Sequence, residues 1–365
     1  MIIGVVGLGT MGLGIAQVYA AAGFQVLATD AFAPARDSAP ARLRAALEPR
    51  VAKGALTAEA LKATMANLTV VESPAALAPA TLIVEAILET LEAKQDLFAA
   101  LEAVIDPETV LATNTSSLSV AAIAQGLTRP ARVLGLHFFN PAPVMKLVEL
   151  VAHPGTSAAA LSRARSVTEA AGKTVIACPD RPGFIVNRCA RPFYGEALAL
   201  LEEGRTASDI DAAMLAAGYR IGPLSLIDLI GADINLAATE GLQAALRHPR
   251  YHVFDSLKCQ VAAGRLGRKS GQGFLFPAPP GPSPPDAAAL ALRIEATLAN
   301  EARWLLAEGG VTAPGIDQAL KLGLNFPRGP FESAASHGAE TIGKTLADLE
   351  SRAPAHLKGR YQPPT

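Results

Sequence analysis

Residues 2–30, IIGVVGLGTMGLGIAQVYAAAGFQVLATD, decide the fold of the first half of the chain. The apolar run Ile2–Val6 has the length and composition of a buried strand, and Gly12–Ala22 is an alanine-rich helical stretch. A second apolar run, Gln25–Thr29, is closed by Asp30. This order predicts a β-α-β unit of about thirty residues.

A glycine-rich turn, Gly7-Leu8-Gly9-Thr10-Met11-Gly12, joins the first expected strand to the helix. Its G-x-G-x-x-G spacing indicates a dinucleotide site because it follows a strand and opens a helix. The first glycine allows a tight turn, the second lets the backbone approach a pyrophosphate, and the third lets helix and strand pack closely. The phosphates would then lie at the positive end of the helix. We expect cofactor contacts from Gly7, Gly9, Thr10, Met11 and Gly12.

The second expected strand ends at Asp30, eighteen residues after Gly12. A carboxylate at this place accepts hydrogen bonds from a ribose 2′-hydroxyl and would repel a 2′-phosphate. The next residue, Ala31, offers no arginine that could offset this repulsion. We therefore expect Asp30 to select NAD over NADP; the alternative is that it only caps the segment that follows.

Strands and helices continue to alternate up to about residue 180. This alternation predicts an α/β fold with a mostly parallel, doubly wound sheet. The expected helices include Glu89–Ile105 and Ser157–Ala171. The further expected strands are Leu68–Val71, Thr81–Ala86, Val110–Ala112, Val133–Leu136, Leu147–Val151 and Thr174–Ala177.

Beyond residue 181 the strand patterns nearly vanish, and Ala/Leu/Glu-rich helices predict an all-α domain. A proline-rich linker interrupts this part, and the helical sequence on its two sides is similar, with Glu196–Gly204 parallel to Glu301–Gly309. Chance similarity between alanine-rich helices is the alternative to a duplication. The expected domains are a sheet domain at 1–181, a helical domain at 182–276, the linker at 277–286 and a shorter duplicated helical unit at 287–365.

The bulk properties narrow the class of protein. A length of 365 residues predicts two or three domains, and a net charge of −1 argues against a nucleic-acid or polybasic membrane surface. The only cysteines, Cys178, Cys189 and Cys259, show no metal-ligand spacing and fit a reduced, cytoplasmic setting. No charged residue precedes Asp30, but the stretch lacks a basic n-region and is broken by glycines, which argues against a signal peptide or membrane span.

Residues 137–149, HFFNPAPVMKLVE, place a histidine and a glutamate twelve residues apart across a proline-rich turn. His137 follows an expected strand at its carboxyl end, where open α/β sheets bind ligands. A histidine can take a proton near neutral pH, and a carboxylate such as Glu149 can orient the ring and stabilise the imidazolium. The segment therefore predicts a proton-transferring pair, although a lone histidine is more often structural.

Several segments, in order and at matching separations, resemble the L-3-hydroxyacyl-CoA dehydrogenases, a group that includes 3-hydroxybutyryl-CoA and 3-hydroxyadipyl-CoA dehydrogenases. The resemblance implies an N-terminal Rossmann-type NAD domain, an all-α C-terminal domain, and a place in fatty-acid or aromatic-acid β-oxidation. The segments are NTSS (114–117), HFFNPAP (137–143), MKLVE (145–149), PGFIVNR (182–188) and GRLGRKSGQGF (264–274).

The resemblance also implies roles for individual residues. His137 would remove the proton of the 3-hydroxyl as hydride leaves C3 for the nicotinamide, Glu149 would orient it, and Asn140 would support it. Ser116 and Asn187 would hydrogen-bond the reacting oxygen or the thioester, although helix capping and bracing of a domain junction are alternatives. The implied contacts on the nicotinamide side of the cofactor are Glu89, Lys94 and Asn114.

The family carries a helical arm that contacts the nucleotide end of CoA, and here the corresponding residues 36–62 offer Arg50 and Lys53. Because lysines are few in this stretch, a solvated surface explains it equally well. Members with one helical domain dimerise through it, so this chain would be a homodimer or a monomer with internally paired helical repeats.

Two other functions fit part of the pattern. A β-hydroxyacid dehydrogenase acting on a free small acid would share the glycine-rich loop at residues 7–12, but that class uses a lysine base. A non-catalytic NAD-binding protein would not need His137 and Glu149.

Overall fold

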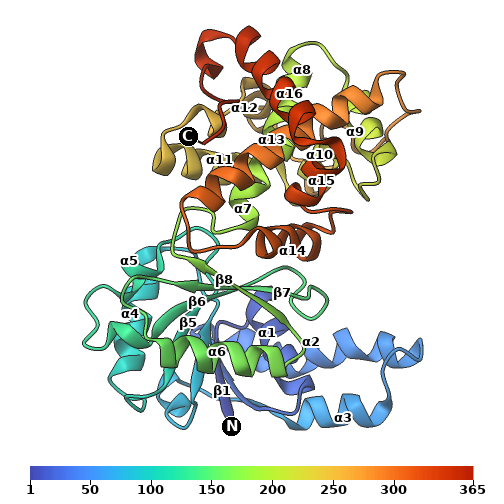
Figure 1. Cartoon of the computed structure of the whole chain (residues 1–365). Coiled ribbons are helices and arrows are strands. Elements are labelled where there is room, and N and C mark those ends of the chain that lie inside the picture. The colour runs from blue at the N-terminus through green and yellow to red at the C-terminus, as the bar shows by residue number, and fades with distance from the viewer. Residues whose placement is uncertain (365) are drawn as a thin grey trace. The chain divides into compact units, whose positions relative to one another are not determined.

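The computed structural model describes residues 1–364 and divides into two compact units, Met1–Arg181 and Pro182–Thr365. Figure 1 shows a sheet flanked by helices in the first unit and helices alone in the second. Within residues 1–364, no helix combines the length and apolar character that crossing a membrane requires.

The first unit is built on one eight-stranded sheet with the order β3-β2-β1-β4-β5-β6-β7-β8. Neighbouring strands run parallel except β6 and β7, which are antiparallel. The expected α/β class with a mostly parallel sheet is confirmed. The strands are β1 (Ile2–Val6), β2 (Gln25–Thr29), β3 (Leu68–Val70), β4 (Leu82–Glu85), β5 (Val110–Thr113), β6 (Val133–Phe138), β7 (Leu147–Ala152) and β8 (Thr174–Pro179).

Helices cover the sheet, and their apolar side chains form its core. The helix α1 lies beside α6, where the Tyr19 and Thr168 hydroxyls are 2.9 Å apart. The helix α4 spans Leu91–Glu102, so the expected bounds Glu89 and Ile105 are wrong; the backbone at the N-cap, Thr90, is extended, with φ −122° and ψ 135°. The helices are α1 (Thr10–Ala21), α2 (Ala33–Ala52), α3 (Ala58–Ala66), α4 (Leu91–Glu102), α5 (Val120–Ala124) and α6 (Ala158–Ala170).

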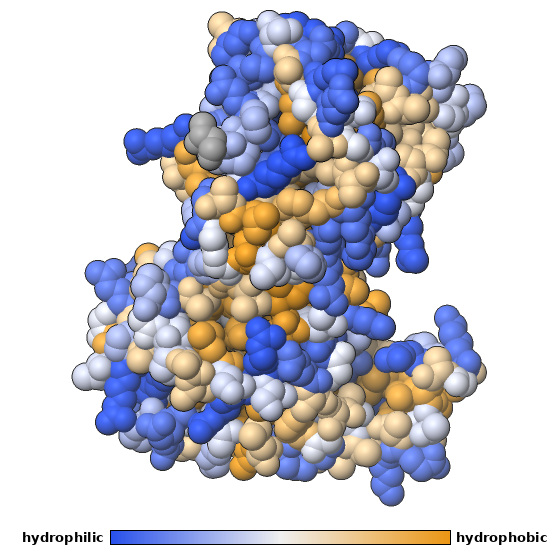
Figure 2. All heavy atoms as spheres, in the orientation of Figure 1, coloured by the Kyte–Doolittle hydropathy of each residue, from blue (hydrophilic) through white to orange (hydrophobic). Residues whose placement is uncertain are grey.

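An arm formed by α2 and α3 projects from this unit (Figure 1). Its helices pack on a small core of Leu43, Leu47 and Leu61. Thr57 caps α3 by accepting a hydrogen bond from the Ala60 amide at 3.1 Å. The space-filling view in Figure 2 shows hydrophilic residues at the end of the arm.

The second unit is helical, as the sequence predicts. Two series of four helices, α8–α11 and α13–α16, follow one another in the same order. The helices are α7 (Val186–Cys189), α8 (Arg191–Glu202), α9 (Ala207–Ala216), α10 (Pro223–Ile230), α11 (Ala232–Leu246), α12 (Asp255–Ala262), α13 (Ala287–Ala307), α14 (Ala313–Leu324), α15 (Pro330–His337) and α16 (Ala339–Arg352).

The two series, each taken with the segments that flank it, exchange ion pairs in which the arginines are buried; the flanking segments are α7 and residues 247–254 for the first series and residues 353–361 for the second. Arg188 donates to Glu301 at 2.8 Å and to Glu308 at 2.7 and 2.6 Å. Reciprocally, Arg293 donates to Glu196 at 2.7 Å and to Glu203 at 2.6 Å. The spacing from each arginine to the two glutamates on its own side is the same in both series.

The same two glutamates receive a second pair of partners. Arg250 donates to Glu301 at 2.7 Å, and Arg360 donates to Glu196 at 3.3 Å. The hydroxyls of Tyr251 and Tyr361 donate to Glu301 and Glu196, respectively. The arginines and the tyrosine of each half thus donate to the glutamate of the other half. Such reciprocal contacts are the pattern of an isologous interface between identical subunits.

Candidate active site

The turn between β1 and α1 has the geometry of a phosphate-binding loop. Gly7 has φ +94°, and a Cβ there would lie 2.4 Å from the Ala86 carbonyl oxygen. A Cβ on Gly12 would lie 1.7 Å from the Gly7 oxygen, so only glycine lets α1 approach the turn. Gly9, the N-cap of α1, makes no side-chain cap and has nothing within 4 Å of its Cβ position. The first amides of α1 therefore face open space that fits a pyrophosphate.

Asp30 follows β2 and ties this turn to the second strand. Its Oδ2 accepts the Leu8 amide at 2.6 Å and its Oδ1 accepts the Phe32 amide at 2.8 Å. Arg36, which the sequence analysis missed, donates from Nη1 to the Asp30 carbonyl at 2.5 Å. The carboxylate is half-buried beside the glycine turn, where a ribose would lie in a dinucleotide site.

Exchanging the charge at this position should change the cofactor preference. Asp30→Ser with Ala31→Arg removes the carboxylate and adds a cation near Arg36, so we expect the NADP/NAD ratio of kcat/KM to rise at least about tenfold. Steady-state kinetics with each cofactor measures this ratio, and the conservative Asp30→Glu variant is the control. An unchanged ratio would show that Asp30 does not discriminate between NAD and NADP.

His137 and Glu149 face each other across the antiparallel pair of β6 and β7. The His137 Nδ1 lies 2.6 Å from the Glu149 Oε2, and the Glu149 side chain is fully buried. His137 is 6% exposed and packs against Phe139, with ring centroids 4.5 Å apart. Because Nδ1 faces the carboxylate, proton exchange with a substrate would go through Nε2.

Two asparagines lie near His137. Asn114 follows the neighbouring strand β5, and Asn140 follows His137 in the chain. The Oδ1 of Asn114 accepts the Phe138 amide at 2.8 Å, next to His137. Asn140 is exposed in the turn after β6. Lys173 holds this turn by donating to the carbonyls of Ala142 and Met145 at 2.5 and 2.7 Å. The turn is therefore anchored on both sides of its proline-rich tip.

Glu89 organises the segment that contains Ser116. Its Oε1 accepts the Thr115 hydroxyl at 2.6 Å and the Ser116 and Ser117 amides at 2.8 and 3.2 Å. Burial opposes ionisation, but these bonds and Lys94 outweigh it and lower the pKa of the Glu89 carboxyl. Helix capping does not explain these serines, because Ser119 is the N-cap of α5.

Lys94 is 1% exposed and bridges two carboxylates. Its Nζ lies 2.5 Å from the Glu85 Oε1 and 3.2 Å from the Glu89 Oε2. Glu85, which the sequence analysis missed, ends β4 fully buried and also accepts the Thr113 hydroxyl at 2.7 Å. A carboxylate closing the apolar strand Leu82–Glu85 was the available signal. In this arrangement Lys94 fixes Glu89, and a direct cofactor contact by Lys94 stays a prediction.

The remaining residues predicted for substrate binding lie on other elements. Arg50 and Lys53 are exposed at the end of the α2–α3 arm. Asn187 belongs to the second unit, in α7, where its carbonyl accepts Arg191 Nε at 3.0 Å. Their contacts with a substrate stay predictions.

Comparison with known families decides the class of this chain. A family profile described as 3-hydroxyacyl-CoA dehydrogenase, NAD binding domain, matches residues 2–181. The profile of the C-terminal domain of the same enzymes matches residues 183–276 and 290–365. The chain belongs to the 3-hydroxyacyl-CoA dehydrogenase family. It is an NAD-dependent oxidoreductase of this class.

The names of individual relatives agree with this family assignment. The 3-hydroxyadipyl-CoA dehydrogenase of Escherichia coli K12 is 47% identical over 274 residues, which cover 74% of this chain but only 58% of that protein. A probable 3-hydroxybutyryl-CoA dehydrogenase of Bacillus subtilis is 38% identical over 74% of this chain and 95% of its own length. The crystal structure of an Escherichia coli 3-hydroxybutyryl-CoA dehydrogenase superposes with TM-score 0.94 and 34% identity, covering 100% of this chain and 97% of that one.

Proposed function

We propose that this protein interconverts an L-3-hydroxyacyl-CoA and the corresponding 3-ketoacyl-CoA, with His137 as the base. The 2.6 Å contact between the His137 Nδ1 and the Glu149 Oε2 supports this role most directly. When bound, NAD supplies the hydride acceptor. His137 takes the proton of the 3-hydroxyl on Nε2 as the carbonyl forms, and the buried Glu149 carboxylate stabilises the imidazolium and fixes its tautomer.

Two further residues would hold the substrate, and a third would support the base. Ser116 and Asn187 hydrogen-bond the reacting oxygen or the thioester, and Asn140 supports the base. The Glu89 bonds to the Ser116 and Ser117 amides keep Ser116 in place while hydride moves. Hydride transfer needs this positioning more than any additional reactive group.

The identity of the acyl group is inferred from the names of relatives. The Escherichia coli relative is named for 3-hydroxyadipyl-CoA, and others are named for 3-hydroxybutyryl-CoA. We propose a substrate from β-oxidation of fatty acids or aromatic acids in the cytoplasm, with Arg50 and Lys53 on the arm contacting CoA.

The decisive assay follows oxidation of NADH with acetoacetyl-CoA, with NADPH and free acetoacetate in parallel. Oxidation of NADH by the thioester alone is the expected result. Activity only with the free acid would replace the proposal by a β-hydroxyacid dehydrogenase. Tight NADH binding without turnover of any acyl-CoA would support a non-catalytic role.

We also propose that the paired helical series takes the place of a dimer contact. The reciprocal bonds of Arg188 and Arg293 already bury the surface that an identical subunit would otherwise cover. We therefore expect sedimentation velocity at micromolar concentration to give the mass of one chain. A concentration-independent dimer would contradict this expectation.

A further inference from the structure

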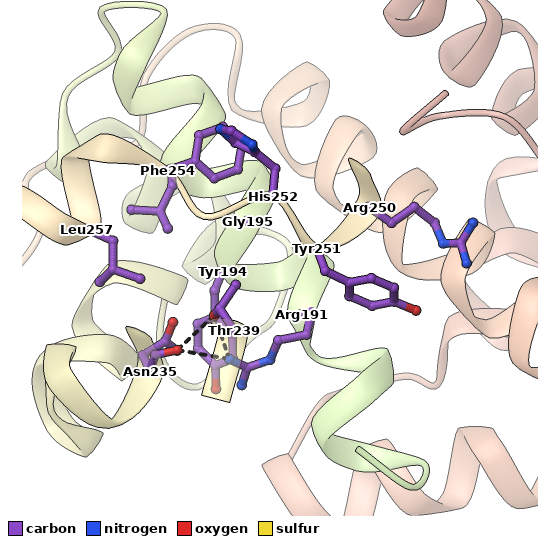
Figure 3. Close-up of a pocket in the computed structure, with 11 residues that line it drawn as sticks. Arg191, Tyr194, Gly195, Asn235, Thr239, Arg250, Tyr251, His252, Phe254 and Leu257 are labelled. Carbon is purple, nitrogen blue, oxygen red and sulfur yellow. Dashed lines mark hydrogen bonds between the residues drawn. The ribbon is translucent and has the colours of Figure 1, made fainter. Parts of the chain in front are cut away.

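A buried polar cluster lies inside the second unit, between α8 and α11. Arg191 and Tyr194 belong to α8, and Asn235 and Thr239 belong to α11. Figure 3 shows these side chains turned toward one another among the residues that line a small cavity. As it stands, the cavity has room for roughly one water molecule, so a carboxylate would enter it only if the surrounding side chains moved apart.

The guanidinium of Arg191 has only neutral partners. Its Nε donates to the Asn187 carbonyl at 3.0 Å, and its Nη1 donates to the Thr239 hydroxyl at 3.1 Å and to the Asn235 carbonyl at 3.4 Å. The ring of Tyr194 lies 4.8 Å from the guanidinium carbon. Burial lowers the pKa of Arg191, and no carboxylate in residues 1–364 offsets this effect.

Every other buried arginine in the described part of the chain has a carboxylate within 3.3 Å. Burying a charge without a counter-charge is costly. Arg191 is therefore the exception, which is explained if its anionic partner is not part of the protein. The paired arginines are Arg132, Arg188, Arg250, Arg293 and Arg360.

Asn235 provides a second observation at the same place. It is 2% exposed, yet neither its side-chain oxygen nor its side-chain nitrogen has a hydrogen-bond partner among the described residues. A buried amide without hydrogen-bond partners destabilises the folded protein unless a ligand or a water molecule completes its hydrogen bonds. Its amide nitrogen can supply a donor beside the guanidinium.

The second helical series shows that the fold does not need this polarity. Alignment on Arg188 and Arg293 places Ala296 and Ala299 at the positions of Arg191 and Tyr194. Alignment on the N-caps Gly231 and Gly338 places Ile342 and Leu346 at the positions of Asn235 and Thr239. All four replacements are buried and apolar.

We propose that Arg191, with Asn235 and Thr239, binds the distal carboxylate of a dicarboxylic acyl-CoA. The proposal rests on the function proposed above, because Asn187 is expected to contact the substrate and its carbonyl bonds Arg191 one helical turn later. Arginine binds carboxylates through two parallel hydrogen bonds, and a buried site strengthens them. The site would therefore distinguish an acyl chain that ends in a carboxylate from one that ends in a methyl group.

The test compares kcat/KM for 3-hydroxyadipyl-CoA and 3-hydroxyhexanoyl-CoA, which both have six acyl carbons. We expect the wild type to prefer the dicarboxylic substrate and Arg191→Met to reduce this preference by about 10²-fold. The matched control, Arg220→Met, changes an exposed arginine of the same unit and should keep the preference.

A second variant keeps the packing unchanged. Asn235→Asp gives Arg191 an internal carboxylate that competes with the substrate, so the preference should fall while the melting temperature holds. Equal activity of the wild type on both thioesters, or equal losses on both in Arg191→Met, would overturn the proposal and leave the dehydrogenase function intact. Failure of the wild type to oxidise any 3-hydroxyacyl-CoA would instead remove the function on which it rests.

Discussion

His137→Gln should lower kcat by about 10²-fold or more while NADH affinity stays nearly unchanged. Glutamine can hydrogen-bond the substrate oxygen, but it cannot accept the proton that the hydroxyl releases. The nucleotide site is built by the β1–α1 turn and Asp30, which the substitution does not touch. Stopped-flow or steady-state rates with acetoacetyl-CoA give kcat, and fluorescence titration gives the NADH dissociation constant.

A nearby buried histidine is the matched control. His153 is 7% exposed, and its Nε2 contacts the Pro130 carbonyl at 3.1 Å rather than a carboxylate. His153→Gln should therefore leave kcat within a few-fold of the wild type. If His137→Gln turned over as fast as His153→Gln, His137 would not be the base.

Glu149→Gln separates orientation of the ring from stabilisation of its charge. The amide can keep a hydrogen bond to Nδ1 but carries no negative charge. Combining it with His137→Gln should lower kcat little beyond His137→Gln alone, because both residues act on one proton transfer.

Local sequence patterns predicted the elements that meet at the cofactor end of the sheet. The β1–α1–β2 unit depends on short-range signals, namely an apolar run, a glycine turn and a closing aspartate, and its strand bounds match the structure. The twelve-residue spacing of His137 and Glu149 indicated a pair. Their direct opposition, however, comes from the register of β6 and β7.

Residues whose partners come from distant segments could not be found in this way. Glu85 could be noticed as a carboxylate that closes an apolar strand, but its bonds to Lys94 of α4 and Thr113 of β5 form only when three segments assemble. The similarity of the two helical series was visible at Glu196 and Glu301, but sequence alone does not tell that each accepts an arginine of the other series. A buried ion pair is a property of packing, and charge spacing does not specify it.

Glu301→Gln should destabilise the second unit by about 3 kcal/mol, because it removes the carboxylate shared by the buried side chains of Arg188 and Arg250. Because the contacts are reciprocal, Glu196→Gln should lower the free energy of unfolding by a similar amount, since it removes the carboxylate that Arg293 and Arg360 share. Replacing the exposed Glu340, which pairs with Lys344, should cost less than about 1 kcal/mol.

The free energy of unfolding can be read at this interface itself. Trp304 is the only tryptophan, it lies on α13 three residues after Glu301, and its ring is 4.2 Å from the Arg250 guanidinium carbon. Urea unfolding followed by its fluorescence therefore reports on the paired helices directly. A loss in Glu301→Gln no larger than that in Glu340→Gln would mean that the reciprocal bonds do not hold the two series together. A loss in Glu301→Gln alone would mean that the pairing is symmetric in geometry but not in energy.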